Sequence, residues 1–207
     1  MTDAATISNV DVAIVGGGVA GCSIAYHLTK LGVTDVALFE RKQLTCGTTW
    51  HAAGLVTQLR ATRNMTELAK YTGELFSSLE VETGQATGFK QNGSIRIAKT
   101  EARFEELKRG VSMARNFGLP ADVIAPEEVK ERWSPIDLEG IVGAVWMPRD
   151  GQVNPADVTM ALAKGARMRG AKIHENTPVT RILVENGKAT GVFTPGGLVR
   201  AKKVVIT

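Results

Sequence analysis

The feature that most constrains this chain is a run of glycines between an apolar segment and a helical one. Residues 16–21 read Gly-Gly-Gly-Val-Ala-Gly and satisfy the pattern G-x-G-x-x-G. The preceding residues, Val10–Val15, are typical of a strand buried on both faces of a parallel sheet. After the glycines, apolar residues recur at the helical positions Ile24, Leu28 and Leu31. The pattern predicts a strand, a tight turn and a helix in succession.

A second strand, Asp35–Phe39, completes a β-α-β unit and ends at Glu40. Glycines let the backbone approach a diphosphate, and the free N–H groups of the helix attract an anion. At the end of the strand, a carboxylate can accept hydrogen bonds from the ribose of an adenine dinucleotide. The residues expected to bind it are Gly16, Gly18, Val19, Ala20, Gly21, Glu40 and Arg41. The glycines alone do not separate FAD from NAD, and a tight turn without ligand is the structural alternative.

The rest of the chain alternates helical and strand-like segments. Helices are expected at 63–83, 101–116, 126–133 and 155–169, and strands at 93–98 and 141–147. From residue 171, short strands separated by Asn-Gly and Pro-Gly-Gly turns predict a three-stranded antiparallel meander. Its last strand is apolar up to Thr207 and has no turn or cap after it, so we interpret the chain as truncated.

Composition excludes several classes of function. Lys and Arg number 25 against 21 Asp and Glu, and the two signs are interspersed, so nucleic acid is not an expected partner. Cys22 and Cys46 stand alone in sequence, which leaves no local zinc site or redox pair, and we expect no metal. The uncharged stretch Val12–Thr29 contains four glycines and does not predict a membrane span.

The first ten residues contain Asp3 but neither Lys nor Arg, which fits neither a secretory leader nor a transit peptide. The default expectation is therefore the cytoplasm of a bacterium. For a eukaryotic source we would expect the mitochondrial matrix, although no transit peptide is seen.

Residues 44–55 read Leu-Thr-Cys-Gly-Thr-Thr-Trp-His-Ala-Ala-Gly-Leu. This segment resembles the flavin-attachment segment of the sarcosine dehydrogenase and dimethylglycine dehydrogenase family. The resemblance extends through residues 82–84, 91–94 and 150–155 to the closing meander, and so covers essentially the whole chain. Gly-Thr-Thr-Trp-His and the following Gln-Leu-Arg of residues 58–60 favour the sarcosine branch.

The resemblance implies a flavoenzyme that removes a hydride from an N-methyl group of a glycine derivative and passes it to FAD. It implies that His51 carries FAD covalently through the flavin 8α-methyl carbon. The cofactor contacts expected from this segment and from the meander are Gly47, Thr48, Thr49, His51, Gly54 and Val179. Without the resemblance, a lone histidine in a loop is more often structural.

The resemblance also implies an α/β fold of the glutathione-reductase-like type. An FAD-binding Rossmann domain would comprise 1–88 and 148–207, interrupted at 89–147 by the start of an inserted α+β substrate-binding domain. Partners would be a small N-methyl amine and either oxygen or an electron-transfer flavoprotein, with tetrahydrofolate on a C-terminal domain that is not in this chain. The family's substrate contacts lie mostly past residue 207, so we assign no catalytic side chain and expect the fragment alone to be inactive.

Two alternatives stay open. A nicotinamide-linked dehydrogenase would share the glycines and Glu40 but would have no use for residues 48–54. A non-catalytic relative that uses FAD as structural support would share every motif.

Overall fold

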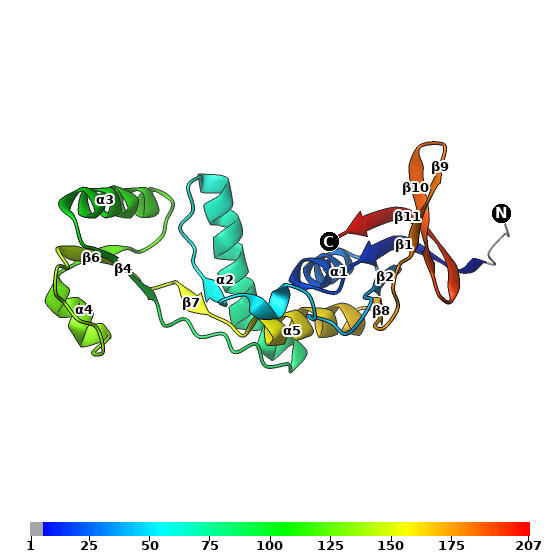
Figure 1. Ribbon diagram of the computed structural model, residues 1–207, viewed down its shortest axis with the longest axis horizontal. Coiled ribbons are helices and arrows are strands. Elements are labelled where there is room, and N and C mark those ends of the chain that lie inside the picture. Colours follow the sequence, from blue (N-terminus) through cyan, green and yellow to red (C-terminus); the bar gives the residue numbers. More distant parts are fainter. Residues whose placement is uncertain (1–5) are drawn as a thin grey trace. The chain divides into compact units, whose positions relative to one another are not determined.

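The computed structural model describes residues 6–207, which fold into two compact units (Figure 1). Unit 1 comprises Met1–Ala53, Ser78–Gly88 and Asn154–Thr207, and unit 2 comprises Gly54–Ser77 and Phe89–Val153. The expectation about a leader rests partly on residues 1–5, which lie outside the described residues. The assignment of 1–88 and 148–207 to an FAD-binding domain, and of 89–147 to a substrate-binding domain, stays a prediction.

Unit 1 is built on a six-stranded sheet with the order β8-β2-β1-β11-β10-β9. Its strands are β1 (Thr6–Val15), β2 (Val36–Phe39), β8 (Lys172–His174), β9 (Arg181–Glu185), β10 (Lys188–Thr194) and β11 (Gly197–Ile206). Strands β8, β2, β1 and β11 are parallel neighbours, whereas β10 pairs antiparallel with both β11 and β9. The expected α/β class and the antiparallel meander are confirmed.

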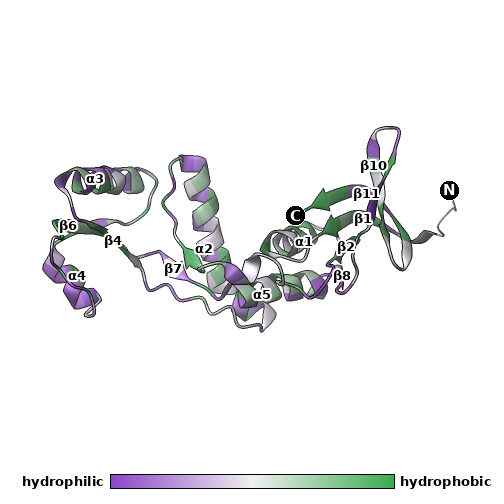
Figure 2. Cartoon of the chain, viewed as in Figure 1, coloured by the Kyte–Doolittle hydropathy of each residue, from purple (hydrophilic) through white to green (hydrophobic). Residues whose placement is uncertain are grey.

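The central strands are apolar because both of their faces are covered. All four residues of β2 are buried, and Val12, Ala13 and Ile14 of β1 are buried as well. In Figure 2 the carboxyl-terminal parts of β1 and β11 have the green colour of hydrophobic residues. Continuous apolar runs are typical of parallel strands that pack on both sides.

Helices α1 (Val19–Lys30) and α5 (Pro155–Met168) pack against each other in unit 1. The apolar repeat of α1 is not its buried face: Leu31 is 81% exposed, and the helix buries Cys22, Ala25, Tyr26 and Thr29. Close contact with α5 selects this face because it carries small side chains and one ring. A Cβ at Gly165 of α5 would lie 2.8 Å from the Tyr26 ring, so the two helices meet without a gap.

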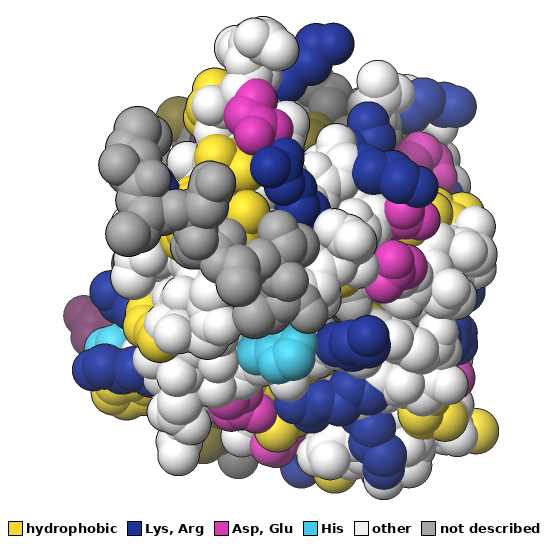
Figure 3. All heavy atoms as spheres, turned by 90° about the vertical axis from the view of Figure 1, so that its right-hand side faces the viewer, with side chains coloured by type: hydrophobic (Ala, Val, Ile, Leu, Met, Phe, Trp, Pro, Cys, Tyr) yellow, Lys and Arg dark blue, Asp and Glu magenta, His cyan; other side chains and the backbone are white. Residues whose placement is uncertain are grey.

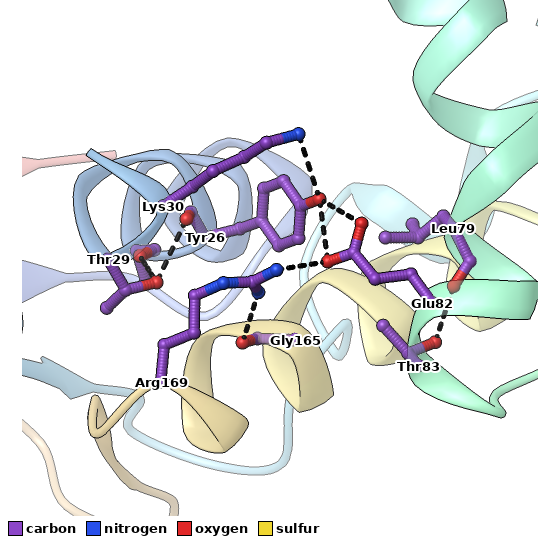
Figure 4. Close-up of polar contacts among 9 residues, drawn as sticks. Tyr26, Thr29, Lys30, Leu79, Glu82, Thr83, Gly165 and Arg169 are labelled. Atoms are coloured by element: carbon purple, nitrogen blue, oxygen red, sulfur yellow. Dashed lines mark hydrogen bonds and ion pairs between the residues drawn. The ribbon is translucent and has the colours of Figure 1, made fainter. Parts of the chain in front are cut away.

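A polar cluster joins α1 and α5 to the last turns of α2 (Arg63–Thr83), as Figure 4 shows. The Tyr26 hydroxyl donates to both carboxylate oxygens of Glu82 at 2.9 and 2.8 Å, and Arg169 Nη2 lies 2.5 Å from Glu82 Oε1. Burial alone would raise the pKa of Glu82, but the hydrogen bonds from Arg169 and Tyr26 lower it below the ordinary value. The ionised carboxylate therefore holds the end of α2 within unit 1.

Unit 2 contains a three-stranded antiparallel sheet in the order β4-β6-β5, a two-stranded sheet and the first part of α2. The other elements are β3 (Leu55–Val56), β4 (Ser94–Ala98), α3 (Glu101–Asn116), β5 (Asp122–Ile124), α4 (Pro126–Arg132), β6 (Gly143–Met147) and β7 (Gly151–Gln152). Helix α3 packs on this sheet through a cluster that includes Leu107, Val111, Val145 and Met147.

The Asp150-Gly151 turn is a buried organising point of unit 2. The Asp150 carboxylate accepts the Gln58 N–H at 2.8 Å and the Ser94 hydroxyl at 2.6 Å, and Arg96 lies 3.8 Å away. The side chain is 1% exposed, so its oxygens depend on these hydrogen-bond partners. These contacts give the turn a structural role.

On the face seen in Figure 3, Lys and Arg side chains are interspersed with Asp and Glu. Among the described residues, no helix combines the length and the apolar character that crossing a membrane requires.

Candidate functional site

A cavity of about 370 Å³ opens in unit 1 at the carboxyl ends of β1, β2 and β11, beside the first turn of α1. Open α/β sheets bind ligands at this edge. The predicted residues that line it are Gly16, Gly18, Val19, Ala20, Glu40, Arg41, Gly47, Thr48, Thr49 and Val179. Three predicted residues, Gly21, His51 and Gly54, are not among its lining.

The glycines of the loop are required by close packing and not only by flexibility. Gly16 has φ +116°, and a Cβ there would come within 2.6 Å of the Thr207 backbone oxygen. A Cβ on Gly21 would overlap the carbonyl oxygen of Gly16, so any side chain would force the turn and the helix apart. At Gly18 a Cβ would meet only Thr49 Oγ1, at 3.0 Å. Backbone atoms thus exclude a side chain at Gly16 and at Gly21, whereas at Gly18 only the Thr49 hydroxyl is near.

The amino end of α1 has no cap from its own N-cap residue. Its N-cap residue is Gly18, which has no side chain, and its first turn has no acidic residue. The Val19 N–H donates to Thr49 Oγ1 at 3.0 Å. The N–H groups of Gly18, Ala20 and Gly21 have no hydrogen-bond partner within residues 6–207. Unpaired donors at the positive end of a helix dipole form an anion site, and a diphosphate fits this donor set.

Glu40 is buried beside this loop as an ionised group. Its Oε2 accepts the Gly17 N–H at 2.7 Å, and its Oε1 accepts the Lys42 N–H at 2.9 Å and the Cys46 thiol at 3.5 Å. Burial alone would raise the pKa of Glu40, but these hydrogen bonds and the charge of Arg41 lower it below the ordinary value. A carboxylate that is ionised here accepts from ribose hydroxyls and repels a 2′-phosphate.

Cys22 packs against the glycine loop from the interior of unit 1. Its thiol is fully buried and lies 3.7 Å from the Gly17 carbonyl oxygen. Burial raises the pKa of the Cys22 thiol to about 12, so the group stays protonated and acts as a small packing residue. Cys46 is exposed at the cavity wall.

His51 lies at the end of the short 3₁₀ helix η1 (Thr49–His51), whose Thr49 is buried. The His51 ring is exposed and lies against the ring of Trp50, with centroids 3.8 Å apart. Within the described part of the chain, the imidazole has no hydrogen-bond partner. An exposed, unpartnered imidazole is free to react, and covalent attachment stays a prediction.

Gly54 lies in unit 2, where it has φ +72° and its carbonyl accepts the Val153 N–H at 2.8 Å. Its predicted contact with the cofactor is likewise untested. Val179 is half-buried, packs against the buried apolar cluster of the unit 1 sheet and lines the cavity.

Sequence reasoning missed part of the cavity wall. The residues it did not single out as lining are Val15, Gly17, Phe39, Cys46, Ile206 and Thr207. Thr207 reaches the loop because β11 pairs in parallel with β1, so its N–H donates to Val15 O at 2.9 Å and its hydroxyl reaches Gly16 O at 3.3 Å. The apolar segment at 203–207 predicts a strand, but its sequence does not indicate which strand it pairs with.

Comparison with known proteins identifies the family. The family described as "DAO: FAD dependent oxidoreductase" matches residues 11–207. The chain belongs to this DAO family. Members of the family depend on FAD, which decides between the two dinucleotides that the glycine loop left open.

Three curated relatives illustrate the range of the DAO family. The chain is 39% identical to 4-methylaminobutanoate oxidase (formaldehyde-forming) of Paenarthrobacter nicotinovorans over 96% of its length, and 39% identical to human (Homo sapiens) mitochondrial sarcosine dehydrogenase, also over 96%. It is 37% identical over 96% to the mitochondrial pyruvate dehydrogenase phosphatase regulatory subunit of Mus musculus. It covers 24%, 22% and 23% of these proteins, about a quarter of each. The resemblance to sarcosine dehydrogenase is confirmed.

The fold of the DAO family is seen in solved structures. The crystal structure of L-proline dehydrogenase from P. horikoshii superposes with a TM-score of 0.90 at 30% identity, covering 97% of this chain and 53% of that one. The expected FAD-binding α/β fold is therefore confirmed.

Proposed function

We propose that the protein of which this chain forms part binds FAD in the unit 1 cavity and oxidises an N-methylated amino acid, with sarcosine or dimethylglycine as the candidate substrates. The observation that carries the proposal is the uncapped amino end of α1 facing a cavity that also contains the ionised Glu40. Membership of the DAO family supports FAD as the ligand. The names of the curated relatives support the class of substrate.

Individual groups of the chain have distinct tasks in this proposal. The N–H groups of Gly18 and Ala20 receive the diphosphate, because both residues line the cavity and their donors are free. Glu40 accepts from the adenosine ribose, and Val179 lines the adenine side. The loop at 47–49 contributes to the wall of the cavity. When bound, FAD supplies the hydride acceptor for the oxidation of the amine.

We further propose that His51 is the point of covalent attachment. Its imidazole is exposed and unpartnered in the described chain, and it follows the cavity-lining Thr49 by two residues. Neutral imidazole is a nucleophile, and the Trp50 ring lies against it with the ring centroids 3.8 Å apart. A covalent bond would keep the cofactor in place through many turnovers.

The remaining parts of the proposal concern the intact protein. Residues 1–88 and 148–207 supply the FAD-binding domain, and 89–147 begin the substrate-binding domain. Oxygen or an electron-transfer flavoprotein takes up the electrons, and tetrahydrofolate traps the one-carbon product where a C-terminal folate domain is present.

The test uses the full-length protein. We expect sarcosine to bleach the flavin absorbance under anaerobic conditions, and flavin to stay with the protein pellet after acid precipitation. His51→Ala should release the flavin into the acid supernatant, whereas His174→Ala, which removes another exposed histidine, should retain it. Flavin that washes out of the wild-type protein in acid contradicts the covalent link. Bound flavin that no N-methyl amine reduces contradicts the activity.

A second candidate function is favoured by one relative. A protein that is 37% identical over 96% of this chain is named as a regulatory subunit of a phosphatase. In that role, FAD in the same cavity would stabilise the fold without turnover. Stoichiometric flavin that resists reduction by sarcosine, dimethylglycine and 4-methylaminobutanoate would favour this function over the oxidase.

A further inference from the structure

Unit 2 contains a second cavity, of about 490 Å³, that the cofactor chemistry does not use. Segment 59–61, strand β4, strand β6 and helix α3 all contribute to its walls. Every residue that lines it belongs to unit 2, so the cavity is complete without the other unit. Its lining combines guanidinium groups with a buried apolar floor.

Four arginines line this cavity, together with one carboxylate. Arg103 is paired with that carboxylate, Glu106, at 2.6 Å, and Arg96 lies 3.8 Å from the buried Asp150. The lining therefore carries a formal excess of positive charge even after its own ion pair is formed. Such an excess attracts an anion, because the apolar walls beside it screen charges less than bulk water does.

Two of the arginines have only neutral acceptors. Arg60 Nη1 donates to Thr57 Oγ1 at 2.7 Å, and Arg109 Nε donates to the Glu105 carbonyl oxygen at 3.4 Å. Within the part of the chain that the structure describes, neither has a carboxylate within ion-pair distance. Each guanidinium group keeps several N–H donors in a planar arrangement that suits a carboxylate.

The floor of the cavity is apolar. It is formed by Leu59, Leu107, Val111, Val145 and Met147, all of which are buried in the core of unit 2. Helix α3 contributes Gly110 to the wall, and a Cβ there would meet no atom within 4 Å. Glycine inside a helix costs about 1 kcal/mol relative to alanine, so the bare position on this wall is not favoured by the helix itself.

We propose that this cleft is a binding site for a small organic dicarboxylate. The two arginines without carboxylate partners, Arg60 and Arg109, each take one carboxylate, and the hydrocarbon between the two groups lies on the apolar floor. An inorganic anion would satisfy the arginines but leave the floor in water, and a monocarboxylate would leave one guanidinium group without a partner. The site depends on unit 2 alone and stands whether or not the protein oxidises N-methyl amines.

The experiment is a calorimetric titration of the full-length protein with alkyl dicarboxylates from succinate to suberate. We expect binding in about the millimolar range for the best chain length, which is what two charge-assisted contacts provide. Butyrate and inorganic phosphate should each bind at least about tenfold more weakly. Arg60→Met and Arg109→Met should each weaken dicarboxylate binding about tenfold, since each removes one charged contact.

Two further variants keep the test independent of charge and of folding. Gly110→Leu should abolish dicarboxylate binding, because it places a side chain in the open space of the cleft and alters no charge. Arg115→Met is the matched control, since Arg115 lies on α3 but outside the cavity and near Asp122. Equal loss in Arg115→Met, equal affinity for phosphate, or no heat with any dicarboxylate would overturn the proposal. Thermal unfolding of each variant shows that it is folded.

Discussion

Helices α1 and α5 pack side by side in unit 1, yet their amino ends are completed in opposite ways. Helix α5 follows Asn154, whose side-chain oxygen accepts the N–H groups of Ala156 and Asp157 at 3.0 and 3.3 Å. Its first residue is Pro155, which has no N–H to satisfy. Helix α1 follows Gly18, which offers no side-chain cap, and has no acidic residue in its first turn, although Thr49 Oγ1 accepts its Val19 N–H.

The difference separates a helix end that serves the fold from one that serves a ligand. A side-chain cap contributes about 1 kcal/mol to stability, and α5 has that contribution whether or not anything is bound. Helix α1 lacks a cap from its N-cap residue, so its remaining N–H donors stay available to an anion. A single residue, asparagine in one helix and glycine in the other, decides which of the two outcomes holds.

The change with the largest expected effect disrupts the packing of the glycine loop against the amino end of α1. In Gly21→Ala the new Cβ overlaps the Gly16 carbonyl oxygen, so the turn and the helix must separate. We expect a loss of about 3 kcal/mol or more in the free energy of unfolding and no measurable FAD binding, measured by urea unfolding and by flavin content. Gly110→Ala is the matched control, because that helical glycine has open space and should become up to about 1 kcal/mol more stable. Full flavin content in Gly21→Ala would contradict the role given to the loop.

A second change gives α1 the kind of end that α5 has. Gly18 has φ −78° and ψ −177°, the extended conformation of an N-cap residue, so Gly18→Asp should cap the helix with a carboxylate. We expect the protein without FAD to become more stable by a few tenths of a kcal/mol, about the gain measured for such caps over glycine. We expect FAD affinity to fall about 100-fold or more, because the new charge occupies the diphosphate site.

Gly18→Ala is the control for this second change, since it adds the same Cβ near Thr49 without a cap or a charge. It should lose much less FAD affinity than Gly18→Asp does. Equal losses in the two variants would show that space, and not the free N–H donors, limits binding at this position.

The local parts of this arrangement could be predicted from the sequence because they depend on neighbouring residues. Strand, glycine turn, helix and second strand all form where the pattern placed them. The Asn154 cap is present, and the Asn186-Gly187 turn has positive φ at both residues, as a two-residue hairpin requires. Each of these features follows from side chains that act within a few residues.

The features that sequence reasoning missed depend on distant partners. The buried face of α1 is set by α5, which begins more than a hundred residues later, so the larger apolar residues of α1 did not reveal it. Thr207 reaches the cavity only through the parallel register of β11 on β1, in which Val15 pairs with Ile206. His51 stands out by resemblance to a family and not by its burial or its partners.

A third change tests how much the hydrogen bonds to Glu40 contribute to the stability of the glycine loop. Glu40→Gln replaces the carboxylate that accepts the Gly17 and Lys42 N–H groups. We expect a loss of about 1–3 kcal/mol in the free energy of unfolding at neutral pH, the usual range for hydrogen bonds to a charged group. Glu139→Gln, which changes an exposed glutamate, should leave stability unchanged.

The pH dependence of the Glu40→Gln effect has a definite sign. The pKa of Glu40 is lower in the folded protein than its ordinary value of about 4.3, so the ionised group stabilises the fold above that value. The stabilisation is lost as the pH falls through the lowered pKa. The difference in unfolding free energy between wild type and Glu40→Gln should therefore be full at pH 7 and shrink below about pH 4. A difference that grows with acidity would contradict an ionised Glu40.

The smallest expected effect comes from removing the side-chain cap at the amino end of α5. Asn154→Ala removes the cap on Ala156 and Asp157 and should lower the free energy of unfolding by about 1 kcal/mol, measured by urea unfolding without FAD. Asn154→Asp preserves the cap and should stay close to wild type. FAD affinity should change less than in Gly18→Asp, because Asn154 does not line the cavity. If Asn154→Ala lowered FAD affinity as much as Gly18→Asp does, the amino end of α5 would also contribute to FAD binding. The assignment of one helix end to the fold and the other to the ligand would then be wrong.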